Sequence, residues 1–293
     1  PAGPRNALTR GPVISRRRFI IAAAGAGLSA TGSGFYIRKI EPAWLRVTTS
    51  QLKLPPGKWP GTPLRVLHLS DLHFSHAVPL SLIDAAITRG LAEKPDLICV
   101  TGDFVTFNES YDAAAYAPVL ARLAAAAPTF ATLGNHDGRF KNPFAVAPHQ
   151  VGELLRHAGL GLLQNRRETL SVRGRRLHLV GVGDLWMREC LPQIAFNNFA
   201  PPADEPVLAL CHNPDAKEAI RPHRWDALLC GHTHGGQCGL PFIGAALAPV
   251  RDKRYLGGVY RYAERWLHVS RGVGNLHGVR LFCRPEISLL EFS

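Results

Sequence analysis

The sequence lacks the features that mark several large classes of protein. It has no internal repeat and no low-complexity tract, and its six cysteines form no CxxC pair. Its mean hydropathy is close to zero, and no apolar run approaches the ~18 residues of a membrane span. A polytopic membrane protein is therefore excluded. With 293 residues, 46% of them apolar, the chain can bury a large core as one α/β domain or as two smaller ones.

Acidic residues are scarce, and their distribution argues against a nucleic-acid partner. The chain has 22 Asp and Glu against 34 Lys and Arg, a net charge of +12. Residues 1–58 hold ten Lys or Arg and one acid, so +9 of this charge belongs to them and only +3 to the remaining 235 residues. Because binding to phosphate backbones requires a strongly basic surface, we expect no nucleic-acid partner.

The basic N-terminus resembles an export signal. Ser15 and three arginines, Arg16 to Arg18, precede an Ala- and Gly-rich apolar run from Phe19 to Ala30. Paired arginines before Phe-Ile are similar to the twin-arginine signal, which implies the twin-arginine translocase as a partner during export. We therefore predict three parts: a signal or retained membrane anchor at 1–36, a linker and lead-in at 37–63, and a catalytic domain at 64–293. The predicted location is the periplasm or cell envelope, exported or membrane-associated.

The cysteines are expected to be free thiols, although an even number in an exported protein also permits disulfides. Cys99, Cys211 and Cys230 each end an apolar, strand-like run. At such positions a thiol acts as a small buried apolar group.

Apolar runs and helical periodicity predict strands and helices along residues 64–293. A helix is predicted at 80–93, where apolar residues recur at helical spacing, and another in the Ala-rich stretch 112–126. Shorter helices are predicted at 150–158 and 216–220. Strands are predicted at 64–69, 96–100, 129–133, 161–164, 169–172, 177–182, 207–211, 226–230, 255–260, 266–269 and 287–290. This order favours an α/β fold of two sheets flanked by helices.

Polar residues that bind divalent metals follow five of these strands: Asp71 and His73, Asp103, Asn135 and His136, His212, and His232 and His234. The first three clusters begin 32 residues apart, about the length of one strand–helix–strand unit. In a parallel sheet this spacing returns the chain to the same edge, so the side chains converge there. Carboxylate, imidazole and amide ligands without sulfur indicate hard or borderline cations, most simply a pair, and hydrolytic chemistry.

Taken together, the clusters resemble the signature of the calcineurin-like metallophosphoesterases. Asp-Leu-His at 71–73, Gly-Asp at 102–103, Gly-Asn-His-Asp at 134–137, His212, and Gly-His-Thr-His at 231–234 occur in order. Each block alone is a weak signal, but the set is specific, and it spans residues 64–236, about 60% of the chain.

The resemblance implies a four-layer α/β/β/α sandwich of two mixed sheets flanked by helices, with two divalent metal ions (Mn, Fe, Zn or Mg). It implies the following ligands: Asp71, His73 and His234 for the first ion, Asn135, His212 and His232 for the second, and Asp103 as a bridge. His136 would be a catalytic residue that faces the phosphoryl group and stabilises charge or protonates the leaving oxygen. A hydroxide shared by the two cations would attack phosphorus in line.

Residues after the last cluster bear on the substrate. Gly-Gly-Gln at 235–237 and Leu-Pro-Phe-Ile at 240–243 resemble a bacterial branch that is exported or membrane-tethered, some of whose members act on UDP-2,3-diacylglucosamine in lipid A synthesis. The resemblance implies a phosphoester or lipid-linked nucleotide substrate and contact with a membrane surface. Two alternatives stand: a broad phosphodiesterase or phosphomonoesterase for phosphate scavenging, and a non-catalytic metal-binding envelope scaffold. The apolar stretch 240–250 is expected to pack as core or loop, with contact to lipid chains as the other hypothesis.

The remaining polar residues are assigned mainly structural roles. Asp137 is expected to orient or cap the chain rather than bind metal, and Asp184 to hold a ligand histidine or a turn. His277 lies in a Gly-flanked stretch, 271–280, for which the cleft and a plain loop are equally favoured, and His76 is not assigned. Hydrogen-bonded structural histidines are expected at His68, His149, His157, His178 and His268.

Overall fold

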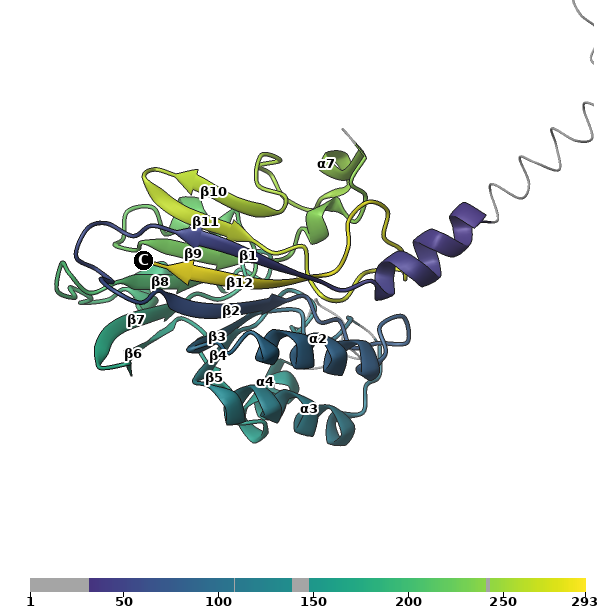
Figure 1. Ribbon diagram of the computed structural model, residues 1–293, viewed down its shortest axis with the longest axis horizontal. Coiled ribbons are helices and arrows are strands. Elements are labelled where there is room, and N and C mark those ends of the chain that lie inside the picture. Colours follow the sequence, from purple (N-terminus) through teal and green to yellow (C-terminus); the bar gives the residue numbers. More distant parts are fainter. Residues whose placement is uncertain (1–31, 108, 139–147, 241–242) are drawn as a thin grey trace, which may run out of the picture.

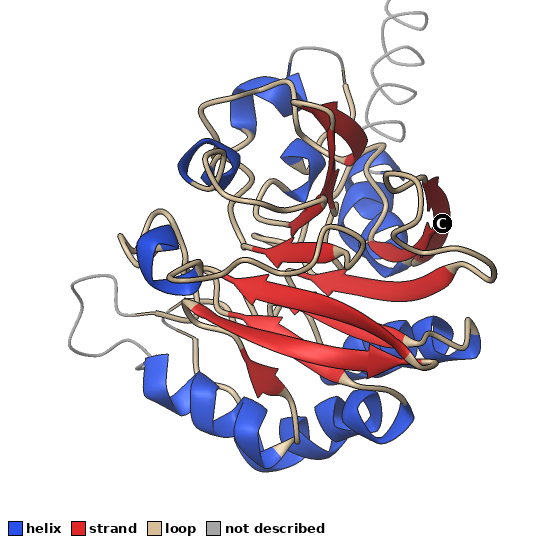
Figure 2. Cartoon of the chain, turned by 90° about the vertical axis from the view of Figure 1, so that its left-hand side faces the viewer, coloured by secondary structure: helices blue, strands red, loops and turns tan. Residues whose placement is uncertain are grey.

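Two six-stranded sheets lie face to face, with helices on their outer sides (Figures 1 and 2). This computed structural model describes residues 32–107, 109–138, 148–240 and 243–293. The central strands β2 (Leu64–Ser70) and β3 (Leu97–Thr101) are buried along almost their whole length, as expected for strands covered on both faces. The predicted α/β fold of two mixed sheets flanked by helices is confirmed.

The first sheet has the order β1-β12-β2-β3-β4-β5. Its other strands are β1 (Arg46–Leu52), β4 (Thr129–Thr132), β5 (Gly161–Leu162) and β12 (Glu286–Phe292). Strands β2 to β5 are parallel, and β12 runs antiparallel to β2. Its outer face is covered by α2 (Leu80–Ala92), α3 (Ala113–Ala126) and α4 (Pro148–His157) (Figure 1). The parallel strands therefore end at one edge, where residues 71, 103 and 135 follow them.

The second sheet has the order β10-β11-β9-β8-β7-β6. Its strands are β6 (Arg166–Val172), β7 (Arg175–Gly181), β8 (Val207–Leu210), β9 (Ala227–Cys230), β10 (Gly258–Tyr262) and β11 (Arg265–Val269). The central strands β7, β8, β9 and β11 are parallel, and the two edge strands are antiparallel to their neighbours. The outer layer on this side is thin, because α5 (Pro192–Ala195) and α6 (Ala216–Ala219) have four residues each.

Alternation along the strands divides the apolar core into three layers. On β8, Leu208 and Leu210 face the other sheet, whereas Val207 and Ala209 face the outer layer, because successive side chains of a strand point to opposite faces. Cys99 is buried between the sheets, and Cys211 and Cys230 are buried under the thin outer layer, all three as free thiols.

The stretch before β2 contributes a strand to the first sheet. Strand β1 lies within 37–63, the stretch expected as a linker, and it pairs in parallel with β12. Sequence analysis missed this strand because most of its side chains are exposed or half-buried, which leaves no apolar pattern to recognise. Before it, a helical segment over 32–40 ends in η1 (Tyr36–Ile40), is followed by η2 (Glu41–Ala43), and extends away from the body (Figure 1).

The segment 32–43 is nevertheless tied to the body. The buried carboxylate of Glu41 accepts hydrogen bonds from the backbone N–H groups of Phe282 and Cys283. Among the described residues, no helix has both the length and the apolar character needed to cross a bilayer. The predicted signal lies mostly at 1–31, outside the described residues.

Candidate metal centre

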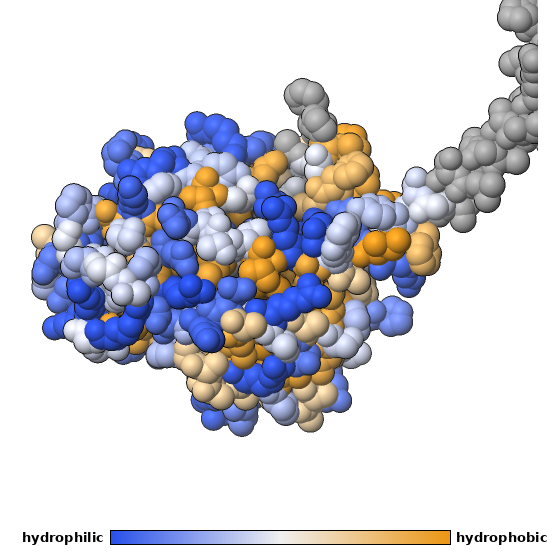
Figure 3. Space-filling model, viewed as in Figure 1, coloured by the Kyte–Doolittle hydropathy of each residue, from blue (hydrophilic) through white to orange (hydrophobic). Residues whose placement is uncertain are grey.

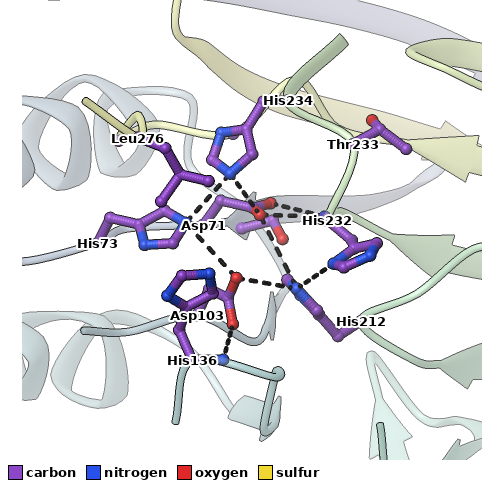
Figure 4. Close-up of polar contacts among 12 residues, drawn as sticks. Asp71, His73, Asp103, His136, His212, His232, Thr233, His234 and Leu276 are labelled. Carbon is purple, nitrogen blue, oxygen red and sulfur yellow. Dashed lines mark hydrogen bonds and ion pairs between the residues drawn. The ribbon is translucent and has the colours of Figure 1, made fainter. Parts of the chain in front are cut away.

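Six of the seven predicted ligands form two compact groups, Asp71 with His73 and His234, and Asp103 with His212 and His232. Within each group, one ligand atom from each residue lies within 4.8 Å of the others, and all six residues are buried. Figure 4 shows the two groups side by side, with His136 next to Asp103. They meet because the strands that carry them end at neighbouring edges of the two sheets.

In the first group, two imidazoles and a carboxylate point at one another. The Nε2 atoms of His73 and His234 are 3.1 Å apart, and His234 Nε2 is 3.3 Å from Asp71 Oδ1. The carboxylate of Asp71 also accepts the backbone N–H of His232, at 3.0 and 3.1 Å from its two oxygens. The first sheet and the chain after β9 are therefore joined at the site itself.

Asp103 connects the two groups through one oxygen. Its Oδ2 atom is 3.5 Å from His73 Nε2 and 3.1 Å from His212 Nε2. The same nitrogen of His212 is 3.2 Å from the Nδ1 atom of His232. A carboxylate oxygen between ligands of both groups is the position that a bridging ligand requires.

Backbone geometry shows how closely the chain is folded around these side chains. Asp71, His73, Asp103, His232 and His234 all have positive φ, between 49° and 69°. This left-handed conformation costs energy for residues other than glycine, and such strain concentrates at functional sites. Nearby, a Cβ atom on Gly134 would lie 2.2 Å from Asp103 Oδ1. Only glycine fits there.

The second ring nitrogen of three histidines is held by a partner. His212 Nδ1–H donates to the carbonyl of Thr101 (2.8 Å), and His232 Nε2–H donates to the carbonyl of Pro249 (3.0 Å). The Nδ1 atom of His73 is 3.3 Å from the hydroxyl of Thr106. Such bonds fix the tautomer and direct the other nitrogen at a metal ion. Sequence analysis did not identify Thr106 or the carbonyls of Thr101 and Pro249, and no sequence signal points to them.

Burial keeps most of these imidazoles neutral. It lowers the pKa of His73 and His232 to about 3, and lowers that of His234 well below its usual value. For His212, burial also lowers the pKa, but Asp103 and Asp71 together raise it well above the ordinary value. Neutral imidazoles offer a lone pair to a cation at neutral pH, so the donors fit a divalent metal.

The two carboxylates of the site also have pKa values shifted in opposite directions. Burial raises the pKa of Asp71 to about 6. In Asp103, burial acts in the same direction, but His212, His136 and His73 together hold its pKa well below the usual range. Asp103, which lies between the two groups, therefore stays ionised to a lower pH than Asp71 does.

Asn135 and His136 complete the predicted set. The side-chain oxygen of Asn135 is buried and has no hydrogen-bond partner, which fits a group reserved for a cation. The backbone N–H of His136 donates to Asp103 Oδ1 (2.8 Å), and its ring Nδ1 accepts the backbone N–H of Phe107 (3.0 Å). The neutral ring therefore carries its proton on Nε2.

Several structural predictions hold. Asp137 accepts the backbone N–H groups of Phe104 and Val105 on Oδ1 and that of Gly134 on Oδ2, so it orients the loops around the site. Asp184 accepts the N–H groups of Trp186 and Met187, which favours its role in a turn.

The predicted structural histidines differ in how much of their environment is described. His68, His178 and His268 are buried and hydrogen-bonded, and His157 is paired with a helix carbonyl. The side chain of His149 lies outside the described part. Trp186, whose ring meets His232 edge-on with the centroids 4.7 Å apart, was missed.

The fold and the two ligand groups define the class of the protein. A model of the calcineurin-like phosphoesterase family matches residues 64–236, the same span that carries the five clusters. The chain belongs to the calcineurin-like metallophosphoesterases, which use divalent metals.

Two proteins of known name are similar to this chain over most of its length. The phosphodiesterase YaeI of Escherichia coli (strain K12) is 46% identical over 286 residues, which cover 95% of this chain and 99% of YaeI. The UDP-2,3-diacylglucosamine pyrophosphatase LpxG of Chlamydia trachomatis serovar D is 28% identical over 303 residues, 86% of this chain and 90% of LpxG. The chain is thus a phosphoester hydrolase with two candidate metal-binding groups.

Proposed function

We propose that this protein hydrolyses a phosphodiester or pyrophosphate bond in a lipid-linked or other envelope substrate, with two divalent cations. The observation that carries the proposal is the position of Asp103 Oδ2 between His73 and His212. Asp71, His73 and His234 would hold one ion, and Asn135, His212 and His232 the other. Two such ions supply neutralisation of the phosphoryl oxygens and a water of lowered pKa.

His136 is proposed as the proton donor. Because its Nδ1 accepts the Phe107 N–H, the neutral ring presents Nε2–H as a donor. Its ring also meets that of His73 edge-on, with the centroids 4.8 Å apart, which keeps it beside the first group. A donor in this place can stabilise a phosphoryl oxygen or protonate the leaving oxygen, a contribution of about 10²–10⁴-fold in rate.

The substrate class rests on similarity to named relatives. YaeI is named a phosphodiesterase, and LpxG a UDP-2,3-diacylglucosamine pyrophosphatase, so a diester or diphosphate bond is favoured over a monoester. Broad phosphate scavenging remains the second candidate. Turnover of bis-p-nitrophenyl phosphate, p-nitrophenyl phosphate and a nucleotide-diphospho-lipid by one preparation distinguishes them: a monoester preference would support scavenging.

Asp103→Asn tests the metal scheme. Loss of the ionised bridge should lower the metal content, measured by elemental analysis, and kcat/KM on bis-p-nitrophenyl phosphate by at least about 100-fold. Asp84→Asn is the matched control, because Asp84 pairs with Arg122 at the half-exposed surface and should change neither quantity. Full metal content and activity in Asp103→Asn would refute the two-metal site. Full metal content in the wild type without hydrolysis of any ester would favour a scaffold.

We further propose that the leader directs the protein to the envelope through the twin-arginine translocase. Support comes from the sequence at 15–30. Replacing Arg17 and Arg18 together with Lys keeps the charge and removes the paired guanidinium groups. Cell fractionation should then find the protein retained in the cytoplasm, and unchanged export would contradict the proposal.

A further inference from the structure

An apolar cavity of about 500 Å³ adjoins the first metal-binding group. His234 is part of its wall, and Figure 4 shows Leu276, another wall residue, beside His73 and His234. Half of the remaining ten wall residues are aliphatic, namely Ile37, Leu247, Pro249, Val279 and Leu281. The other five are Gly236, Gln237, Cys238, His277 and Arg280. A phosphoryl group held at the metal centre would therefore have an apolar space next to it.

Hydrogen bonds fix the walls of this cavity. The side-chain amide of Gln237 binds both backbone groups of Leu276, accepting its N–H and donating to its carbonyl. The backbone N–H of Arg280 donates to the carbonyl of Ile37 (3.0 Å). The guanidinium of Arg280 is fully buried and donates to main-chain carbonyls of the same loop, including those of Gly272 and Cys283. The space is a built feature of the fold, with the helical segment 32–43 as one side.

The surface around the cavity is apolar and basic. Eight large apolar residues of the described chain are exposed. Six of them lie in three stretches that also carry wall residues of the cavity, 32–44, 243–249 and 276–282: Phe35, Ile40, Trp44, Ile243, Leu247 and Phe282. Figure 3 shows this gathering at the end of the molecule that carries α7 (Ile243–Leu247) and segment 32–43. Exposed apolar side chains grouped in this way mark a docking surface.

Basic residues among these apolar side chains indicate which kind of partner docks on the surface. Arg38 and Lys39 are exposed on η1 between the apolar residues, and the guanidinium of Arg284 lies 4.0 Å from the centroid of the Trp44 ring. Aromatic and aliphatic residues interspersed with cations are typical of surfaces that rest on anionic lipid headgroups. The segment also continues directly from residues 1–31, for which the sequence predicts a membrane-directed leader. A bilayer fits both the charge and the place of the chain.

We propose that the cavity bounded by Ile37, Leu247, Leu276, Val279 and Leu281 is the subsite for an acyl chain of a membrane-anchored phosphoester, whose phosphoryl group lies at the metal centre. This inference rests on the proposed function and adds to it the part of the substrate that is recognised. The exposed residues around the mouth would lie in the headgroup region, so that a lipid passes from the bilayer to the site with its chain covered.

A series of alkyl p-nitrophenyl phosphate diesters tests the proposal without vesicles. The metal-loaded full chain is assayed on the methyl, butyl and octyl diesters, each below its critical micelle concentration. Full burial of one methylene changes an equilibrium by about fourfold, so partial burial of the octyl chain should raise kcat/KM on the order of 10–100-fold over methyl. A flat series with hydrolysis of the methyl diester would overturn the subsite alone. Absence of hydrolysis throughout would instead refute the proposed function.

Two substitutions test whether the preference for the octyl diester over the methyl diester arises in this cavity. Val279→Trp should fill the cavity and bring the octyl-to-methyl ratio of kcat/KM close to one. Leu247→Ser changes an exposed wall residue, 65% accessible, and should lower the ratio severalfold without a folding defect. Ile194→Ser is the matched control, because Ile194 is 54% exposed on α5 and does not border the cavity. An unchanged ratio in Leu247→Ser, or an equal fall in Ile194→Ser, would overturn the assignment.

Discussion

Asp137 gives the sharpest test of how the loops of the site are held. It is fully buried, and its two oxygens accept three backbone N–H groups: Phe104 (2.8 Å) and Val105 (3.3 Å) on Oδ1, and Gly134 (2.9 Å) on Oδ2. These groups belong to the loops that carry Asp103 and His136. The carboxylate thus joins the chain after β3 to the chain after β4.

Asp137→Asn removes one of these hydrogen bonds and places two hydrogen-bond donors against each other. An amide oxygen can keep the Oδ1 partners, but the amide nitrogen would then face the N–H of Gly134. A buried donor left without its acceptor costs about 1–3 kcal/mol, so the free energy of unfolding should fall by about 2 kcal/mol. For a chain of this size that lowers Tm by roughly 4–8 °C. Displacement of Asp103 and His136 should also reduce kcat/KM by about 10–100-fold.

The measurements are thermal unfolding, elemental analysis and hydrolysis of bis-p-nitrophenyl phosphate. Asp226→Asn is the control, because Asp226 also accepts a backbone N–H, that of Val207 (2.8 Å), and lies just before β9, at the end of that strand remote from the ligands. Asp226→Asn should lower Tm and leave kcat/KM and metal content close to wild type. If Asp137→Asn lost stability but kept full activity and metal, Asp137 would stabilise the fold without positioning the site. Unchanged stability would refute the hydrogen-bond argument.

Three further predictions follow from the geometry. Gly134→Ala places a methyl group 2.2 Å from Asp103 Oδ1, so metal content and kcat/KM should both fall at least about tenfold, and wild-type values would contradict the fit. Removal of metals with a chelator should reduce hydrolysis to background, and activity should return with an added divalent ion; activity that survives complete removal, verified by elemental analysis, would exclude metal dependence. The third concerns pH: burial lowers the pKa of His268 from 6.5 to about 4, so the folded state binds fewer protons, and stability is lost as the pH falls below 6.5. Between pH 6.5 and about 4, the free energy of unfolding measured with urea should fall more steeply in the wild type than in His268→Gln. The difference should be about 1.4 kcal/mol per pH unit, about 3 kcal/mol in all; the same pH dependence in both proteins would disprove this prediction.

The sequence alone was sufficient for the class of protein, and it pointed to the six residues that the structure gathers into two groups. Each cluster directly follows an apolar strand, and parallel strands place their carboxyl ends together, so Asp71, Asp103 and Asn135 had to share an edge. Helices α2 and α3 were also predicted, because the helical spacing of apolar residues and a run of alanines are local signals. These features depend on residues a few positions apart.

Only the tertiary structure decided which atoms face one another. The carbonyls of Thr101 and Pro249, which fix the two tautomers, have no side-chain identity to recognise. Strand β1 pairs with β12 more than 200 residues away, and the bond between Arg280 and Ile37 that closes the apolar cavity spans a similar distance. A contact of that kind depends on how two sheets and a terminal segment pack, which no local pattern encodes. The sequence therefore determined which chemical groups are available at the site, whereas the cavity beside them arose from the packing of distant segments.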